Sequence, residues 1–115
     1  MTMTARISRN RAALVALNRL DAAAQRQLLP SLSRDALLAV VECAKNIILE
    51  RVELDDSQLA WMRRRERDLR RLVAKRTPDR ERIRILQKGG FLAGLLAPIL
   101  LKTVGGLASG LINGL

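Results

Sequence analysis

Histidine and tyrosine are absent from this 115-residue chain, cysteine occurs once, and the aromatic side chains are limited to Trp61 and Phe91. Without histidine, the chain has no imidazole to serve as a general base or as a metal ligand. The single cysteine, Cys43, excludes an intrachain disulfide and a multi-cysteine zinc site. Two aromatic residues are too few for a platform on which single-stranded bases stack. These absences favour a binding or structural protein without cofactor or metal over an enzyme.

Positive charge is in excess and is concentrated in one part of the chain. Lys and Arg total 21 against 11 Asp and Glu, which gives a net charge of +10. Residues 61–88 hold twelve basic and four acidic groups, whereas residues 1–60 are nearly neutral. The length allows one small domain. We therefore divide the chain into short helices or a flexible arm over 1–32, a basic helical module over 33–88 and an apolar, glycine-rich tail over 89–115.

Apolar residues at helical spacing predict two short helices near the start of the chain. The first is expected over 11–20 and the second over 22–29, with Asp21 as its N-cap and Pro30 as its end. The polar stretch before them is expected to be a frayed terminus.

Two longer helices follow and predict an all-α fold. Ser33 suits the N-cap of a helix over 34–51, and Asp55 or Asp56 suits the cap of a helix over 57–76. The short loop between them favours antiparallel packing, so the predicted architecture is a small helical hairpin or bundle. Its core is small enough that a partner or a homo-oligomer is expected to stabilise it.

A final basic helix is expected over 78–88. Thr77, Pro78 and Asp79 form a helix start, with Thr77 as the N-cap, proline at the first helical position and an acid in the first turn. Cys43, on the apolar face of the 34–51 helix, is expected to be a small buried side chain, because no histidine is present to activate it.

Arginine dominates the basic zone and indicates a polyanion as the partner. Twelve basic groups face only four acids there, so most lack a local partner, and their mutual repulsion is relieved by phosphates. With no base-reading motif, the expected mode is contact with the phosphate backbone of double-stranded DNA. The candidate nucleic-acid-binding residues are Arg63, Arg64, Arg67, Arg70, Arg71, Lys75, Arg76, Arg80, Arg82, Arg84 and Lys88.

The apolar segment over 91–115 is interrupted by Pro98, Lys102 and a glycine pair. The uncharged part before Lys102, Phe91–Leu101, is too short for a standard membrane span. Insertion in a membrane, packing on another protein and mobility remain open, whereas an extra buried helix of the same domain is disfavoured because so small a domain has little surface to cover it. The candidate membrane or partner contacts are Phe91, Leu92, Leu95, Leu96, Ile99, Leu100 and Leu101.

The junction Gln87-Lys88-Gly89-Gly90-Phe91-Leu92, between an arginine-rich segment and an apolar tail, resembles the precursors of the small adenovirus core protein X, or mu. The segments Cys43-Ala44 and Asn46-Ile47-Ile48 are similar to those of small virion proteins from adenovirus-like Polinton and adintovirus elements. The resemblance implies a DNA-condensing protein of the virion that is present in the host nucleus during assembly. The chain departs from the adenovirus protein in having predicted helices and no near-continuous arginine run, which suggests a folded module with a capsid or core partner.

The same resemblance implies cleavage by a maturation protease between Gly90 and Phe91, with Gln87 and Gly89 as part of the recognised sequence. Two glycines also suit an extended, slim segment in a protease cleft. The alternative is that Gly89 and Gly90 form the C-cap of the preceding helix.

The sequence thus predicts a viral core or minor virion protein that binds and helps to condense double-stranded DNA. Two alternatives remain. One is a membrane-active or membrane-anchored virion protein that uses residues 91–115 and anionic headgroups. The other is a helical subunit whose basic face meets a capsid protein.

Overall fold

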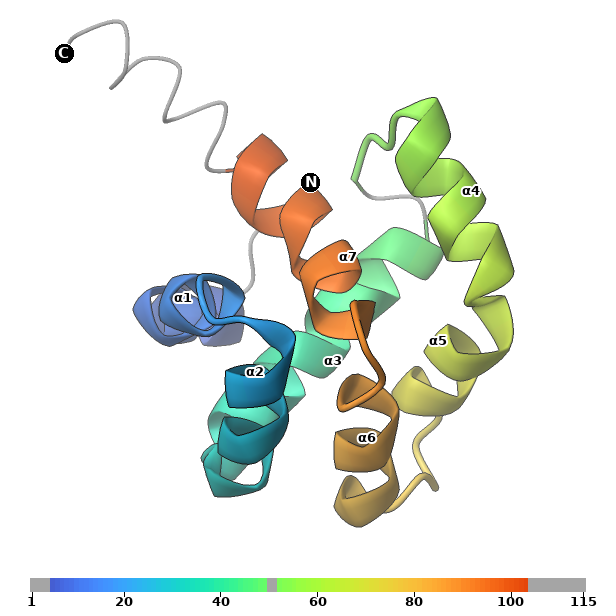
Figure 1. The fold of residues 1–115 in the computed structure, drawn as a ribbon. Helices are drawn as coiled ribbons and strands as arrows, with labels where there is room; N and C mark the ends of the chain where they lie inside the picture. Colours follow the sequence, from blue (N-terminus) through green and yellow to red (C-terminus); the bar gives the residue numbers. More distant parts are fainter. Residues whose placement is uncertain (1–4, 50–51, 104–115) are drawn as a thin grey trace, which may run out of the picture.

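Seven helices make up most of the part of the chain that the computed structural model describes, residues 5–49 and 52–103 (Figure 1). They are α1 (Ala5–Asn18), α2 (Ala22–Leu28), α3 (Arg34–Ile48), α4 (Asp56–Arg64), α5 (Glu66–Val73), α6 (Asp79–Leu86) and α7 (Phe91–Ala97). A 3-10 turn, η1 (Leu29–Ser31), follows α2, and a π-helical turn, η2 (Pro98–Thr103), follows α7. No strand occurs within these ranges, so the predicted all-α class is confirmed.

Three predicted caps start their helices as expected. The Asp21 carboxylate accepts a hydrogen bond from the Ala24 amide at 2.8 Å, and Ser33 Oγ accepts one from the Ala36 amide at 3.1 Å. Asp55 forms a capping box with Gln58, in which each side chain accepts from the other residue's backbone N–H. These local hydrogen bonds satisfy N–H groups that have no partner inside the helix.

The first helix begins earlier than the sequence pattern predicts. α1 starts at Ala5, so the expectation of a frayed terminus is wrong for residues 5–10. Ile7 is completely buried, on the same face as Leu14 and Leu17. Its burial against the core outweighs the polarity of its neighbours, because one anchored side chain keeps the first turns of the helix in place.

The helix predicted over 57–76 is in fact two helices that meet at Arg65. Arg65 lies outside helical geometry, with φ −106° and ψ 12°. The six residues between Met62 and Leu69 are all charged, so no apolar side chain holds the middle of a continuous helix on the core. The break lets Trp61 and Met62 of α4 and the buried Leu69 of α5 each pack against the core.

Helix α6 also begins differently from the prediction. Pro78 is its N-cap residue, and no side chain caps the helix. Thr77 does not cap α6, because its hydroxyl donates to the carbonyl oxygen of Arg71 at 2.6 Å. The threonine therefore closes the turn between α5 and α6.

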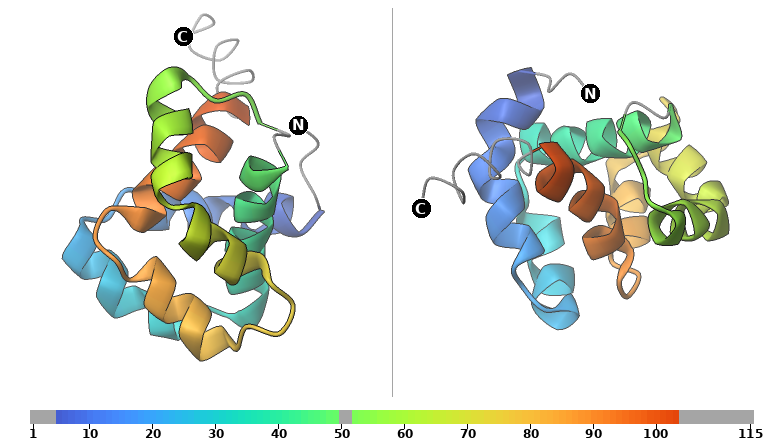
Figure 2. Two further views of the ribbon diagram at one scale, coloured as in Figure 1. Left: turned by 90° about the vertical axis from the view of Figure 1, so that its right-hand side faces the viewer. Right: turned by 90° about the horizontal axis from the view of Figure 1, so that it is seen from above.

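The apolar segment that starts at Phe91 lies in the core. Figures 1 and 2 show α7 between α1 and α4, against α3. In α7 and the following turn η2, six side chains are at most 4% exposed: Phe91, Leu92, Leu95, Leu96, Ile99 and Leu100. The expectation that this segment is not a buried helix of the same domain is wrong for residues 91–100, and the core continues across the predicted boundary at residue 89.

The reason is that α7 is apolar on all sides. A helix of that kind is stable only where other helices surround it. The neighbouring helices α1 and α3 bring apolar side chains such as Leu14 and Val40, and α7 fills the space that they leave between them.

A glycine lets α4 approach α7 closely. Trp61 packs against Phe91 with ring centroids 5.6 Å apart and an angle of 59° between the planes. A Cβ atom at Gly94 would lie 2.4 Å from Cε2 of Trp61, which is too close for any side chain. The absence of a side chain at Gly94 is therefore what allows the indole to lie on α7.

Candidate nucleic-acid interface

Each of the four acids in the basic zone binds a cation of the protein itself. The pairs are Glu66 with Arg70 at 2.8 Å, Asp68 with Lys88 at 2.8 Å, Glu81 with Arg71 at 2.6 Å, and Asp79 with both Arg82, at 3.1 Å, and Arg34. Four of the predicted DNA contacts, Arg70, Arg71, Arg82 and Lys88, thus have acidic partners inside the protein. These pairs and the break at Arg65 divide the predicted DNA contacts of α4 and α5 into paired and unpaired cations.

Arg82 is a structural residue, and its assignment as a DNA contact is wrong. It is only 7% exposed. Its Nε donates to the Leu72 carbonyl at 3.1 Å, its Nη2 to the Ala74 carbonyl at 2.9 Å, and its Nη1 to Asp79 at 3.1 Å. Arg82 therefore satisfies carbonyl groups at the C-terminal end of α5, where a helix leaves them without partners.

Seven predicted contacts remain exposed, and no ion pair within the described ranges involves them. They are Arg63, Arg64, Arg67, Lys75, Arg76, Arg80 and Arg84. We call them the free cations. With the local acids already neutralised, their charge faces solvent without compensation.

The free cations lie on two neighbouring parts of the fold. Arg63, Arg64 and Arg67 flank the break between α4 and α5. This junction lies on the side of the molecule away from α1 and α2 (Figure 1). Lys75 and Arg76 lie in the turn from α5 to α6, and Arg80 and Arg84 follow on α6. Because α5 packs against α6, the two groups of free cations lie on adjacent helices.

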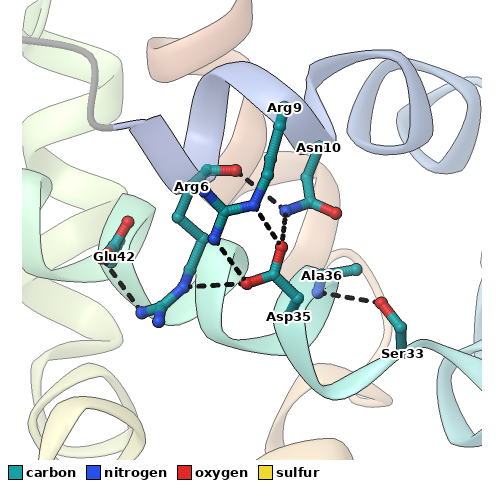
Figure 3. Close-up of polar contacts among 7 residues, drawn as sticks. All are labelled: Arg6, Arg9, Asn10, Ser33, Asp35, Ala36 and Glu42. Atoms are coloured by element: carbon teal, nitrogen blue, oxygen red, sulfur yellow. Dashed lines mark hydrogen bonds and ion pairs between the residues drawn. The ribbon is translucent and has the colours of Figure 1, made fainter.

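A second charged cluster, at the α1–α3 contact, was not predicted from the sequence. Asp35, in the first turn of α3, accepts hydrogen bonds from Arg9 Nε at 2.9 Å, Asn10 Nδ2 at 2.7 Å and Arg6 Nε at 3.2 Å (Figure 3). Arg6 also reaches Glu42 at 3.2 Å. The i, i+3, i+4 spacing of Arg6, Arg9 and Asn10 places them on one face of a helix. This pattern could have been recognised in the sequence if the first helix had been predicted to start before residue 6. The cluster joins α1 to α3.

This cluster predicts a loss of stability in acid. Hydrogen bonds from Arg9 and Asn10 hold the pKa of Asp35 well below its ordinary value of 3.8. A lowered folded-state pKa contributes stability that is present above about pH 4 and is lost as the pH falls further. The free energy of urea unfolding should therefore be higher for the natural chain than for D35N near neutral pH, and this difference should shrink towards roughly pH 3. A difference that stays constant with pH would contradict the assignment.

The residues predicted as membrane or partner contacts are core residues wherever their side chains are described. Phe91, Leu92, Leu95, Leu96, Ile99 and Leu100 pack inside the molecule, and the side chain of Leu101 lies outside the described part. In the folded protein they are therefore unavailable to a membrane or a second protein.

The predicted protease junction is a tight turn. Gly90 has φ +76° and ψ −6°, values typical of the third position of a type II turn, and the Phe91 amide donates to the Lys88 carbonyl at 3.0 Å. Gly89 and Gly90 are exposed, whereas Phe91 is fully buried. The C-cap of α6 is Gln87, so the alternative prediction, that Gly89 and Gly90 form this C-cap, is wrong.

Gln87, the other predicted protease contact, joins α6 to α2. Its Nε2 donates to the Arg26 carbonyl at 2.9 Å, and Arg26 Nε donates to the Gln87 carbonyl at 3.3 Å. Cleavage after Gly90 remains a prediction, and it would require local opening of this half-buried junction.

Cys43 is buried as expected, and burial raises the pKa of its thiol to about 12. A thiol of this kind stays protonated at neutral pH. Within residues 5–49 and 52–103, no three His, Cys, Asp or Glu side chains come together in a way that suits a metal ion.

No family model, curated protein or solved structure matches the chain. In the described residues, no single helix is long and apolar enough to cross a membrane. Only α6 together with residues 91–100 meets that criterion, as a pair bent by 91°.

Proposed function

We propose that this protein binds double-stranded DNA through its phosphate backbone, as a non-enzymatic core or minor virion protein. The free cations carry this proposal. They remain exposed and uncompensated after every acid of the basic zone has taken a partner. A polyanion is the partner that relieves such a concentration of charge.

The predominance of arginine among the free cations supports phosphate as the chemical group that they bind. Six of the seven free cations are arginines, whose planar guanidinium can donate two hydrogen bonds to one phosphate. They lie on helices or on a turn that Arg82 and Thr77 hold in place, so their backbones are ordered before DNA arrives. Contacts of this kind fix position on a duplex without reading its sequence. Weak sequence preference is therefore part of the proposal.

We further propose, from the resemblance to adenovirus core protein precursors, that this binding takes place in a virion and in the host nucleus, with capsid or core proteins as further partners. The fold supports a folded DNA-binding module more than an extended condensing peptide, because the basic helices pack on a shared core.

The membrane-active alternative has weaker support. The apolar side chains that it needs fill the centre of the molecule, so insertion would require α7 to leave α1, α3 and α4. That opening would expose the remaining core to water.

The test is the salt dependence of DNA binding by the full chain. For the natural chain, we expect log affinity against log salt to have a slope of about −4 or steeper, measured by fluorescence anisotropy with a random-sequence duplex. Replacing Arg63, Arg64, Arg67 and Arg76 with glutamine should make the slope shallower by about 3 to 4, because about one counterion is released for each phosphate contact.

The control is R19Q/K45Q, which removes two exposed, unpaired cations outside the basic zone, Arg19 just after α1 and Lys45 on α3. Its slope should stay within about 1 of that of the natural chain. Weak binding with a shallow slope for the natural chain would overturn the proposal, and the basic surface would then belong to an acidic protein or to lipid headgroups.

A further inference from the structure

The strongest local feature of the basic surface is a hollow on α6. It has a volume of about 210 Å³ and is lined by Pro78, Arg80, Glu81 and Arg84. Both arginines are free cations, and they are one helical turn apart. This part of α6 therefore combines positive charge with a concave shape.

The two arginines project from the side of α6 opposite its buried edge. At about 100° per residue, Arg80 and Arg84 each lie roughly 160° from Arg82 and about 40° from each other. Arg82 is buried against the end of α5, which directs the opposite face towards solvent. The same packing that buries one arginine therefore exposes the other two as a pair.

The acids of α6 do not neutralise this pair. Asp79 is engaged by Arg34 and Arg82, and Glu81 accepts a hydrogen bond from Arg71 at 2.6 Å. Glu81 lines the hollow, but its charge is compensated by a cation from α5. The two guanidinium groups are thus left as the uncompensated charges of the hollow.

We propose that this hollow is the seat of a DNA phosphate, held by Arg80 and Arg84 together; the proposal rests on the DNA-binding function above. A phosphate oxygen is an acceptor of strong, charge-assisted hydrogen bonds, and two arginines one turn apart provide donors from two sides. The other free cations then meet phosphates singly, whereas on α6 two arginines share one phosphate, and this defined contact sets how the protein lies on the duplex.

The test separates shape from charge. R80K/R84K keeps both charges but removes the planar fork, and R63K/R64K makes the same exchange beside the break between α4 and α5. With the full chain and a random-sequence duplex, R80K/R84K should weaken binding severalfold more than R63K/R64K, with the salt slope retained. R80Q/R84Q should in addition make the slope shallower by about 2.

The outcomes distinguish this inference from the function on which it rests. Equal losses for R80K/R84K and R63K/R64K, in a protein that binds DNA with a steep salt slope, would overturn the phosphate seat and leave DNA binding standing. A natural chain without salt-dependent DNA binding would overturn both. Thermal unfolding of each variant should match the natural chain, because all four substituted side chains are exposed and unpaired.

Discussion

A chain that ends at Gly90 should lose its cooperative unfolding transition. It would lack the six side chains of residues 91–100 that are at most 4% exposed, from Phe91 to Leu100. Burial of one large apolar side chain is worth about 1.5–3 kcal/mol, and the whole stability of a domain is about 5–15 kcal/mol. The loss therefore exceeds what a domain of this size can tolerate.

The measurement is urea unfolding followed by far-ultraviolet circular dichroism. The shortened chain should show a reduced helical signal and no steep transition. A chain shortened in this way that unfolds like the natural protein would show that α7 is dispensable and that the apolar segment acts elsewhere.

Single substitutions give a graded version of this test. Leu95 is completely buried, so L95A should reduce the free energy of unfolding by about 2–5 kcal/mol. The neighbouring Ala93 is exposed on the same helix, and A93S should change stability by less than about 1 kcal/mol. Similar effects of the two substitutions would contradict the buried position of α7.

Among the basic side chains of the basic zone, loss of the Arg82 guanidinium should be the most damaging to stability. R82Q should lower the free energy of unfolding by roughly 2–4 kcal/mol, because it leaves the Leu72 and Ala74 carbonyls without their donors and weakens the hold on Asp79. R82K should recover part of this loss, since an ammonium group keeps the charge but cannot reach all three acceptors in the same geometry.

The matched control is R80Q on the same helix. Arg80 is exposed and has no partner in the described part of the chain, so its removal should change stability by no more than about 0.5 kcal/mol. Both variants lose one positive charge, so a difference between them in urea unfolding measures the buried contacts alone. Equal stabilities would mean that Arg82 is one more surface cation.

Comparing Arg80 with Arg82 in both the stability and the DNA-binding experiments separates the two roles of arginine on α6. Arg80 belongs to the proposed phosphate seat and should affect binding without affecting stability. Arg82 holds the turn that carries Lys75 and Arg76, so its loss should affect stability first. A protein whose arginines formed one undivided surface would show no such separation.

Local features of this protein were readable from its sequence. Asp21, Ser33 and Asp55 start helices as predicted, because a capping side chain binds an amide only three residues away. The all-α class follows from the same short-range signals. The excess of basic over acidic groups in residues 61–88 can likewise be counted in the sequence without knowing the fold.

The tertiary structure decided where the apolar segment lies and, apart from the local pairs Glu66–Arg70 and Asp79–Arg82, which charges are free. Arg34 meets Asp79 and Lys88 meets Asp68 across long stretches of chain, so no local spacing distinguishes these paired cations from Arg80 or Arg84. The burial of α7 depends in the same way on the space that α1, α3 and α4 leave between them. Capping is a property of a few consecutive residues, whereas charge pairing and core packing are properties of surfaces that exist only after the chain has folded.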